Sequence, residues 1–156
     1  MSKSLEQRIQ ELEDRDAIKE LTARYCWHVA HGEGEGVARL FTEDGVLEVR
    51  DGNFKPVRGG MALLEFYRAS VNKPEMAVPF IHNHIIILEG DSAHGTCMID
   101  ARFDRSGTSV IAAGWYDDKY RRVGGKWLFA ERVLSFHHVA PLKQGWAEAR
   151  NKNLSS

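Results

Sequence analysis

The sequence of 156 residues lacks features that several broad classes of protein require. Lysine and arginine together number 21 against 22 acidic residues, so no basic excess exists to attract nucleic acid or anionic lipid. The longest purely apolar run is about four residues, far short of the roughly 20 that cross a bilayer. The first residues, MSKSLEQRIQELEDRD, are charged throughout and do not have the pattern of a secretory signal. We therefore expect a cytoplasmic protein with no nucleic-acid or membrane partner.

Cysteine is also scarce, and no repeat or low-complexity segment is present. Cys26 and Cys97 are the two cysteines, and both lie in apolar stretches. Two such residues do not make a disulfide framework, so buried free thiols are the simpler interpretation. The length, with 43% hydrophobic and 28% charged residues, fits one globular domain. We place this domain at residues 1–142 and a polar tail at 143–156.

Helical periodicity dominates the first half of the chain. Ser4 can cap a first helix, and a stripe with three- and four-residue spacing predicts its buried face: Ile18, Leu21, Tyr25 and Val29. The glycines of residues 32–36 are expected to end this helix. The segments VARLFTEDG (37–45) and GGMALLEFYRAS (59–70) predict two further helices. Between them, VLEVRDGNFKPV (46–57) predicts a hairpin that turns at Asp51 and Gly52.

From Val78 onward the pattern changes to long β-rich runs. Residues 78–103 predict two strands joined at Glu89-Gly90-Asp91, and residues 109–139 predict two more joined at Gly124-Gly125. Antiparallel strands of about ten or more residues exceed the usual length, so we expect a strongly curved sheet. Helices first and a long meander last predict an α+β domain whose helices cover one face of the sheet.

Several phrases, in their order, resemble the SnoaL-like branch of the NTF2-like superfamily. They are IKELTARYCW, ARLFTEDGVLEV, GGMALLEFYR, NHIIILEGDSAHG and AAGWYDDKYRRVGGKWLFAERVLSF, which run from about Ile18 to Phe136. The branch includes scytalone dehydratase, bile-acid dehydratase and hexachlorocyclohexane dehydrochlorinase. The resemblance implies an NTF2-like cone, in which a curved, mostly antiparallel sheet wraps around the N-terminal helices and an apolar cavity opens at one end. Many members pair through the outer face of the sheet, so we expect a homodimer or homotrimer.

The resemblance also implies where a site would lie. Dehydrating and isomerising relatives use a tyrosine and an aspartate on the first helix, a strand histidine, and an arginine on the last strand. Tyr25 matches the tyrosine and Arg132 the arginine, whereas Ala30 and Pro79 stand where the aspartate and the histidine would be. A cavity phenol can protonate a leaving hydroxyl, and an inward arginine can hold an anionic group. The alternatives are a core tyrosine bonded to a carbonyl and an arginine in a salt bridge.

Histidines close to these gaps are candidates for the missing base. An unperturbed imidazole titrates near ~6.5, so such a residue can exchange protons at neutral pH. His28 is the first choice because it lies on the stripe of Tyr25, although a satisfied core histidine would look the same. His82 and His31 follow, and His31 could equally be solvated at the glycine break.

The register of the histidine-bearing strand decides which side chains face the cavity. His82 and His84 share one face of that strand, and Asn83 takes the other. If Pro79 marks the inward register, Asn83 faces the cavity and the two histidines face out. A bulge next to the proline would reverse this arrangement.

Further residues are expected to bind substrate. Tyr116 matches a position that lines the pocket in the family, and Leu134 and Phe136 alternate inward with Arg132 on the last strand. Trp27 belongs to the helix end that we expect to wall the cavity. Asp100 and Arg102 are either a cavity ion pair or exposed cross-strand charges.

Metal and cofactor sites are not predicted. HNHIIILEG has the His-x-His-x4-Glu order of a cupin metal motif, but Met76 stands where that motif has glycine, and no second motif follows. No glycine-rich phosphate loop follows a predicted strand. We therefore expect a cofactor-free lyase or isomerase, dehydratase-like or carbon–carbon cleaving, that acts on a small hydrophobic, hydroxylated aromatic or polycyclic molecule. The alternatives are a non-catalytic ligand-binding domain and the small subunit of a ring-hydroxylating dioxygenase.

Overall fold

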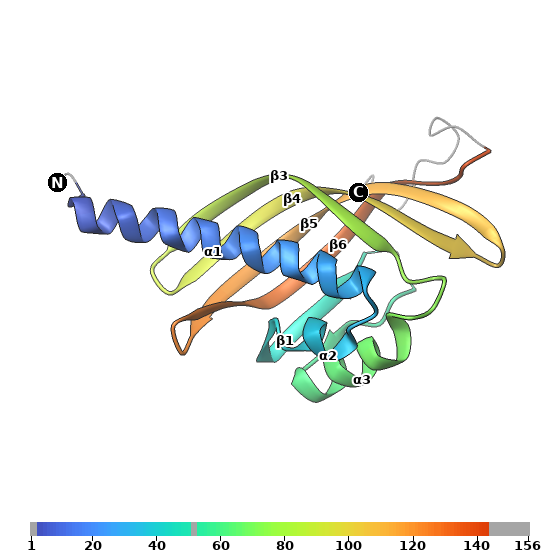
Figure 1. Cartoon of the computed structure of the whole chain (residues 1–156), viewed down its shortest axis with the longest axis horizontal. Coiled ribbons are helices and arrows are strands. Elements are labelled where there is room, and N and C mark those ends of the chain that lie inside the picture. The colour runs from blue at the N-terminus through green and yellow to red at the C-terminus, as the bar shows by residue number, and fades with distance from the viewer. Residues whose placement is uncertain (1–2, 51–52, 144–156) are drawn as a thin grey trace.

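The computed structural model describes residues 3–50 and 53–143 (Figure 1). The elements follow in the order α1 (Leu5–Ala30), α2 (Gly34–Ala38), β1 (Phe41–Val49), β2 (Val57–Arg58), α3 (Gly60–Ser70), β3 (Val78–Glu89), β4 (Ser92–Arg105), β5 (Thr108–Val123) and β6 (Lys126–Pro141). The six strands form one sheet in the order β2-β1-β6-β5-β4-β3. The β1–β6 pair is parallel and the others are antiparallel. The predicted α+β class, with a mostly antiparallel sheet, is confirmed.

The first helix begins and ends where the sequence predicts. Ser4 Oγ accepts a hydrogen bond from the Gln7 backbone N–H at 3.1 Å, while Gln7 Oε1 accepts one from the Ser4 N–H at 2.8 Å. This reciprocal capping satisfies two donors that the first turn leaves unpaired. At the other end Gly32 has φ +70°, a conformation that glycine adopts without a steric penalty.

The prediction of a second helix over residues 37–45 is wrong. The helix α2 has five residues and ends at Ala38, and β1 begins at Phe41. Phe41 pairs with Phe129 of β6 in the parallel ladder, so a partner distant in sequence decides its conformation. Within α2, a Cβ at Gly34 would lie 2.8 Å from the backbone of Tyr67. The glycines therefore allow α2 to approach α3 closely, in addition to ending α1.

The four long strands and their turns agree with the predictions. They contain 12, 14, 16 and 16 residues, and tight turns join β3 to β4 at Gly90 and β5 to β6 at Gly124 and Gly125. The predicted helix at residues 59–70 is α3. The β1–β2 hairpin is also present, although its predicted turn at residues 51–52 lies outside the described residues, as does all of the predicted tail except Lys143.

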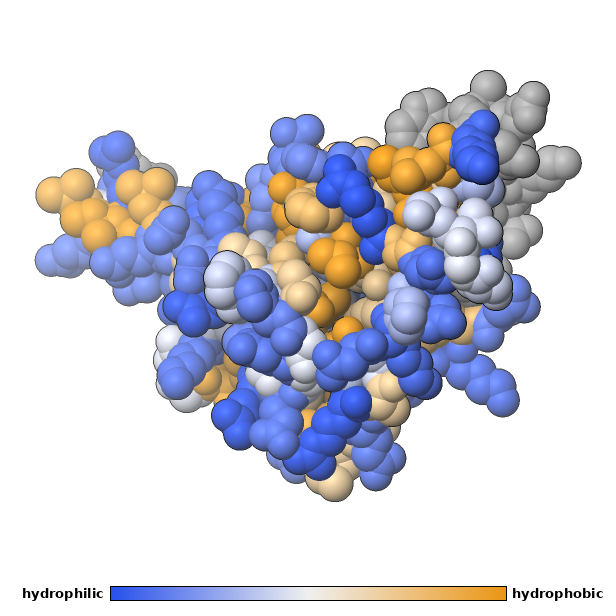
Figure 2. Space-filling model, turned by 45° about the vertical axis from the view of Figure 1, so that its right-hand side comes forward, coloured by the Kyte–Doolittle hydropathy of each residue, from blue (hydrophilic) through white to orange (hydrophobic). Residues whose placement is uncertain are grey.

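The helix α1 lies across one face of the sheet, and α2 and α3 lie near its C-terminal end (Figure 1). Its buried face is Asp14, Ile18, Leu21, Thr22, Tyr25 and Val29, which meets the inward side chains of β3 to β6 in one core. Cys97 is buried there and Cys26 is partly buried, both as free thiols. The N-terminal end of α1 projects past the sheet (Figure 1), and Leu5, Ile9 and Leu12 are exposed there. Figure 2 shows hydrophobic surface at this projecting end. Among the described residues, no helix is long and apolar enough to cross a membrane.

Candidate functional site

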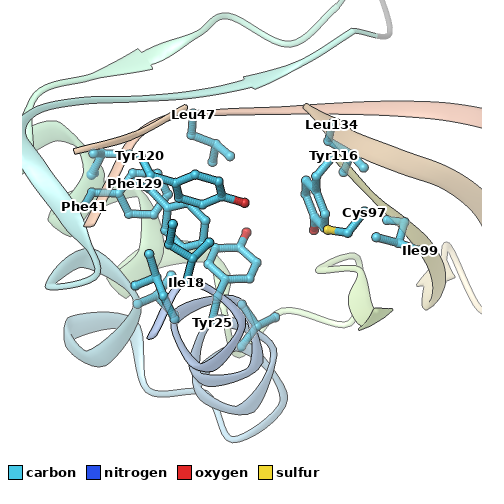
Figure 3. Packing of buried hydrophobic residues seen from close by; sticks show 14 of the residues in the cluster. Ile18, Tyr25, Phe41, Leu47, Cys97, Ile99, Tyr116, Tyr120, Phe129 and Leu134 are labelled. Atoms are coloured by element: carbon cyan, nitrogen blue, oxygen red, sulfur yellow. The ribbon is translucent and has the colours of Figure 1, made fainter. Parts of the chain in front are cut away.

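A cavity of about 320 Å³ lies between α1, α3 and the inner face of the sheet. Its wall is mostly apolar, with side chains from β1, α3, the loop that follows α3, β4 and β6. Tyr25 and Tyr116 supply phenol groups to the wall, and Leu134 and Phe136 extend it along β6. Figure 3 shows Tyr25 rising from α1 toward the sheet, while Tyr116 and Leu134 extend from the sheet. These four predicted residues are thus brought together, as alternation on β5 and β6 allows.

Three phenols cluster at one side of the cavity. The hydroxyls of Tyr25 and Tyr67 lie 3.1 Å apart, and the rings of Tyr25 and Tyr116 meet edge to face with centroids 6.0 Å apart. Burial raises the pKa of Tyr25, and the positive charge of Arg132 opposes that rise. Burial likewise raises the pKa of Tyr67 and of Tyr116 well above the ordinary phenol value. All three hydroxyls therefore stay protonated at neutral pH and can donate hydrogen bonds.

Arg132 does not project into the cavity, contrary to the prediction. Its side chain is fully buried, with the guanidinium carbon 3.7 Å from the ring centroid of Tyr116, 4.2 Å from that of Tyr25 and 4.4 Å from that of Phe129. The two tyrosine rings thus stand between the charge and the cavity, where cation–π contact stabilises it. Nη2 also bonds to Asp118 Oδ2 at 3.1 Å. Burial favours loss of the proton, but Asp118 together with Tyr116, Tyr25 and Cys97 outweighs burial, so the pKa of Arg132 is raised.

A polar chain that sequence reasoning missed continues from Arg132. Asp118 Oδ2 accepts a hydrogen bond from the Tyr120 hydroxyl at 3.0 Å, and that hydroxyl lies 3.0 Å from His84 Nε2. Burial raises the pKa of Asp118 to about 6, although Arg132 opposes the shift. Burial also lowers the pKa of His84 to about 4, with help from the charges of Arg132 and Lys19. The sequence held a signal for this chain: Asp118 lies two residues from both Tyr116 and Tyr120 and so shares their inward face of β5.

The histidines predicted at the end of α1 lie away from the cavity. His28 does not share the buried stripe; its Nδ1 pairs with Glu33, and its ring packs against Gly36. His31 is exposed, bonds to the Trp27 carbonyl at 2.8 Å and stacks on the Trp27 ring at 3.9 Å. Trp27 itself is 61% exposed. Tyr25 and Val29 are four residues apart and lie on the buried face of α1. Trp27, His28 and His31 lie at other angles around the helix and therefore point away from that face.

A bulge corrects the prediction for the histidine-bearing strand. The β3–β4 register shifts between His82 and Ile85, and Asn83 has φ +48°. Pro79 faces inward as expected, but the bulge leaves His82 and Asn83 exposed and turns His84 toward the core. The predicted placement of Asn83 in the cavity is therefore wrong, and the histidine that faces the core is the half-buried His84 rather than His82.

Asp100, which is half-buried, and Arg102, which is exposed, are charges on the outer face of β4 rather than a cavity ion pair. On β4 the inward side chains are Cys97, Ile99 and Ala101, so the residues between them point outward. Asp100 pairs with His82 at 3.3 Å, and the Arg102 guanidinium lies 4.6 Å from the ring centroid of Phe80.

No group of three or more histidine, cysteine or acidic side chains in the described part of the chain could hold a metal ion.

Comparison with known proteins places the chain in a family. The model of the SnoaL-like domain matches residues 10–133. Rv3472 of Mycobacterium tuberculosis, whose function is unknown, is 27% identical over 83% of this chain and 75% of its own, with a TM-score of 0.72. A candidate scytalone dehydratase from Novosphingobium aromaticivorans is 22% identical over 90% of this chain and 93% of its own, with a TM-score of 0.74. Hexachlorocyclohexane dehydrochlorinase (LinA) type 2 is 16% identical over 86% of this chain and 93% of its own, with a TM-score of 0.75. No curated protein matches the chain.

Proposed function

This chain belongs to the SnoaL-like family, which includes dehydratases and dehydrochlorinases, and we propose that it is a cofactor-independent lyase or isomerase. Its substrate would be a small hydrophobic molecule, a hydroxylated aromatic or polycyclic one. The observation that carries the proposal is that Tyr25 and Tyr116 present two phenols to the buried end of a mostly apolar cavity, with the charge of Arg132 directly behind both rings.

The phenols fit the task of binding an oxygen that gains negative charge. In a dehydration, a carbon–oxygen bond breaks while a neighbouring carbon loses a proton, and the departing hydroxyl leaves as water. Tyr25 and Tyr116 would donate hydrogen bonds to that oxygen, or to the enolate oxygen of an isomerisation. Water is largely excluded from the buried phenols, so these donors act in a medium of low polarity, where each interaction is stronger. Arg132 adds a fixed positive charge that need not reorganise during the reaction.

The described cavity wall contains no histidine that could accept the proton. His28, His31 and His82 lie away from the cavity, and Glu75, at its exposed rim, is the carboxylate among the described lining residues. This observation favours a second candidate function, in which the domain binds the same class of molecule without converting it. Both functions predict binding, and turnover separates them.

Two variants that each remove one buried hydroxyl test the proposal. A panel of hydroxylated one- and two-ring aromatic compounds would be incubated with the protein in D₂O, and loss of hydroxyl or deuterium incorporation would be followed by NMR. We expect Tyr25→Phe to lower the turnover rate about 100-fold, the usual effect of removing one oxyanion donor. Thr22→Val is the matched control, because it removes a buried hydroxyl of the same helix that donates to the Lys19 carbonyl and lies outside the cavity wall.

The outcomes separate the candidates. Equal turnover rates in Tyr25→Phe and the wild type would contradict the role of the phenol. Ligands that raise the melting temperature, with neither exchange nor elimination, would leave the binding function. A panel that neither binds nor reacts would contradict both.

A further inference from the structure

The charged side chains of the cavity wall stand together at its opening. Lys73, Glu75 and Arg105 are the charged lining residues among those described, and all three are exposed, whereas Tyr25 and Tyr116 are buried. The cavity therefore has a polar rim, which consists of Lys73, Glu75 and Arg105, and a deep end with phenols. A ligand that fills it must have an apolar body between two polar ends.

Backbone contact holds the two cations of the rim in one place. Lys73 belongs to the loop between α3 and β3, and Arg105 ends β4. The Asp104 N–H donates a hydrogen bond to the Pro74 carbonyl at 2.8 Å, which joins the residue after Lys73 to the residue before Arg105. The Arg105 guanidinium also lies 5.5 Å from the ring centroid of Phe103, which lines the cavity. The two cations therefore stand at the same opening although they come from separate elements.

Among residues 3–50 and 53–143, no side chain of opposite charge pairs with the three rim residues. The side chains of Lys73, Glu75 and Arg105 form no ion pair or hydrogen bond with any residue that the structure describes. Asp104 lies next to Arg105 but not in the cavity wall, and its Oδ1 accepts a hydrogen bond from the Gly107 N–H at 2.7 Å. Two cations and one carboxylate leave the rim with a net charge of +1. This charge matches a single carboxylate better than a dianionic phosphate or a cationic group.

We propose, on the basis of the proposed function, that the cavity takes ring-bearing monocarboxylic acids, with the carboxylate held at the rim by Lys73 and Arg105. The ring system occupies the apolar middle, and an oxygen at its far end reaches the phenols. The volume of about 320 Å³ is at the lower limit for ligand pockets, roughly 300 to 1,000 Å³, which favours one or two rings. Glu75 reduces the attraction for the acid and disfavours more highly charged ligands.

A matched pair of probes tests the inference by titration calorimetry: 6-hydroxy-2-naphthoic acid and its uncharged amide, 6-hydroxy-2-naphthamide. We expect the acid to bind about fivefold more tightly at low ionic strength, because exposed ion pairs are individually weak. This preference should fall toward unity in about 0.5 M NaCl, which screens exposed charges.

Three variants locate the preference. The double variant Lys73→Gln/Arg105→Gln should lose the preference for the acid and, with Glu75 as the remaining rim charge, bind the amide slightly more tightly. Glu75→Gln should raise the preference for the acid. Arg102→Gln is the matched control, because Arg102 is an exposed arginine of the same strand, β4. Its guanidinium stacks on the Phe80 ring outside the cavity, so this variant should keep the wild-type preference.

Each outcome decides between the inference and the proposed function. Equal affinities for acid and amide in the wild type would overturn the inference and leave a cavity that binds ring compounds. A preference that persists in the double variant would also overturn it. Binding of neither probe would overturn the inference and the proposed function together.

Discussion

Asp118 and Arg132 form an ion pair at 3.1 Å in which neither side chain is exposed to solvent. The pair does not satisfy all polar atoms of the two residues, since Asp118 Oδ1 and Arg132 Nε and Nη1 have no hydrogen-bond partner among the described residues. The desolvation free energy of this buried ion pair is larger than that of an exposed pair. The surrounding aromatic rings and the Tyr120 hydroxyl offset part of it. The pair fixes the charge behind the phenols and should therefore be costly to break.

Replacement of Asp118 by asparagine should destabilise the protein by about 3–5 kcal/mol, because it leaves the buried charge of Arg132 uncompensated. Urea denaturation at neutral pH measures the free energy of unfolding. Asp117→Asn is the control, since Asp117 lies on the other face of β5 and pairs with Arg50 at 3.5 Å in partly exposed surroundings. Its effect should stay within about 1 kcal/mol. Similar losses in the two variants would contradict the importance of the buried pair.

His84 should make the protein less stable as the pH falls from about 6.5 to about 4. Its pKa is about 4 in the folded protein against the ordinary value of 6.5, so in this range the unfolded chain binds the proton and the folded one does not. Asp118 has the opposite effect on stability. Its pKa is raised from 3.8 to about 6, so between these pH values the folded protein binds the proton more readily than the unfolded chain, and stability rises as the pH falls. Subtracting the free energy of unfolding of a His84 variant from that of the wild type removes most of the contribution of Asp118, because both proteins contain it.

The variant His84→Gln, whose amide can still bond to Tyr120, isolates the effect. The free energy of unfolding of the wild type minus that of the variant should fall as the pH is lowered through this range. Chemical denaturation at a series of pH values measures it. A difference that stays constant from pH ~7 to pH ~4 would show that His84 keeps an ordinary pKa.

Asp14 should be the anchor that fastens α1 to the β5–β6 hairpin. Its carboxylate accepts hydrogen bonds from Arg122 Nη1 and Nη2 at 2.7 Å each and from Trp127 Nε1 at 3.0 Å. Burial favours protonation of Asp14, but these donors outweigh it and lower its pKa. Asp14→Asn should cost about 2–3 kcal/mol in the free energy of unfolding, because charge-assisted bonds are stronger than neutral ones. Asp16→Asn, an exposed neighbour, should change stability by less than about 0.5 kcal/mol, and equal effects would contradict the anchor.

Local sequence patterns predicted most elements of this fold. Ser4 and Gln7 are three residues apart and therefore cap α1, and the glycine turns at Gly90 and Gly124 join strands whose period is visible in the sequence. The stripe that contains Tyr25 predicted the inner face of α1, and alternation predicted the inward positions of Leu134 and Phe136. These features depend on neighbours a few residues away, and such interactions are the same in any tertiary setting.

Tertiary structure decided which polar side chains meet. The bulge at Asn83 depends on pairing with β4, and it turned His84 toward the core and Asn83 outward, whereas strict alternation had assigned the opposite faces. Pairing of Phe41 with β6 overrode the helical pattern of residues 37–45. The sequence alone determined the order of the elements and the presence of phenols and an arginine on inward stripes. That the rings of Tyr25 and Tyr116 cover Arg132 instead of sharing the cavity with it was decided by packing, because burying a charge requires partners from several strands at once.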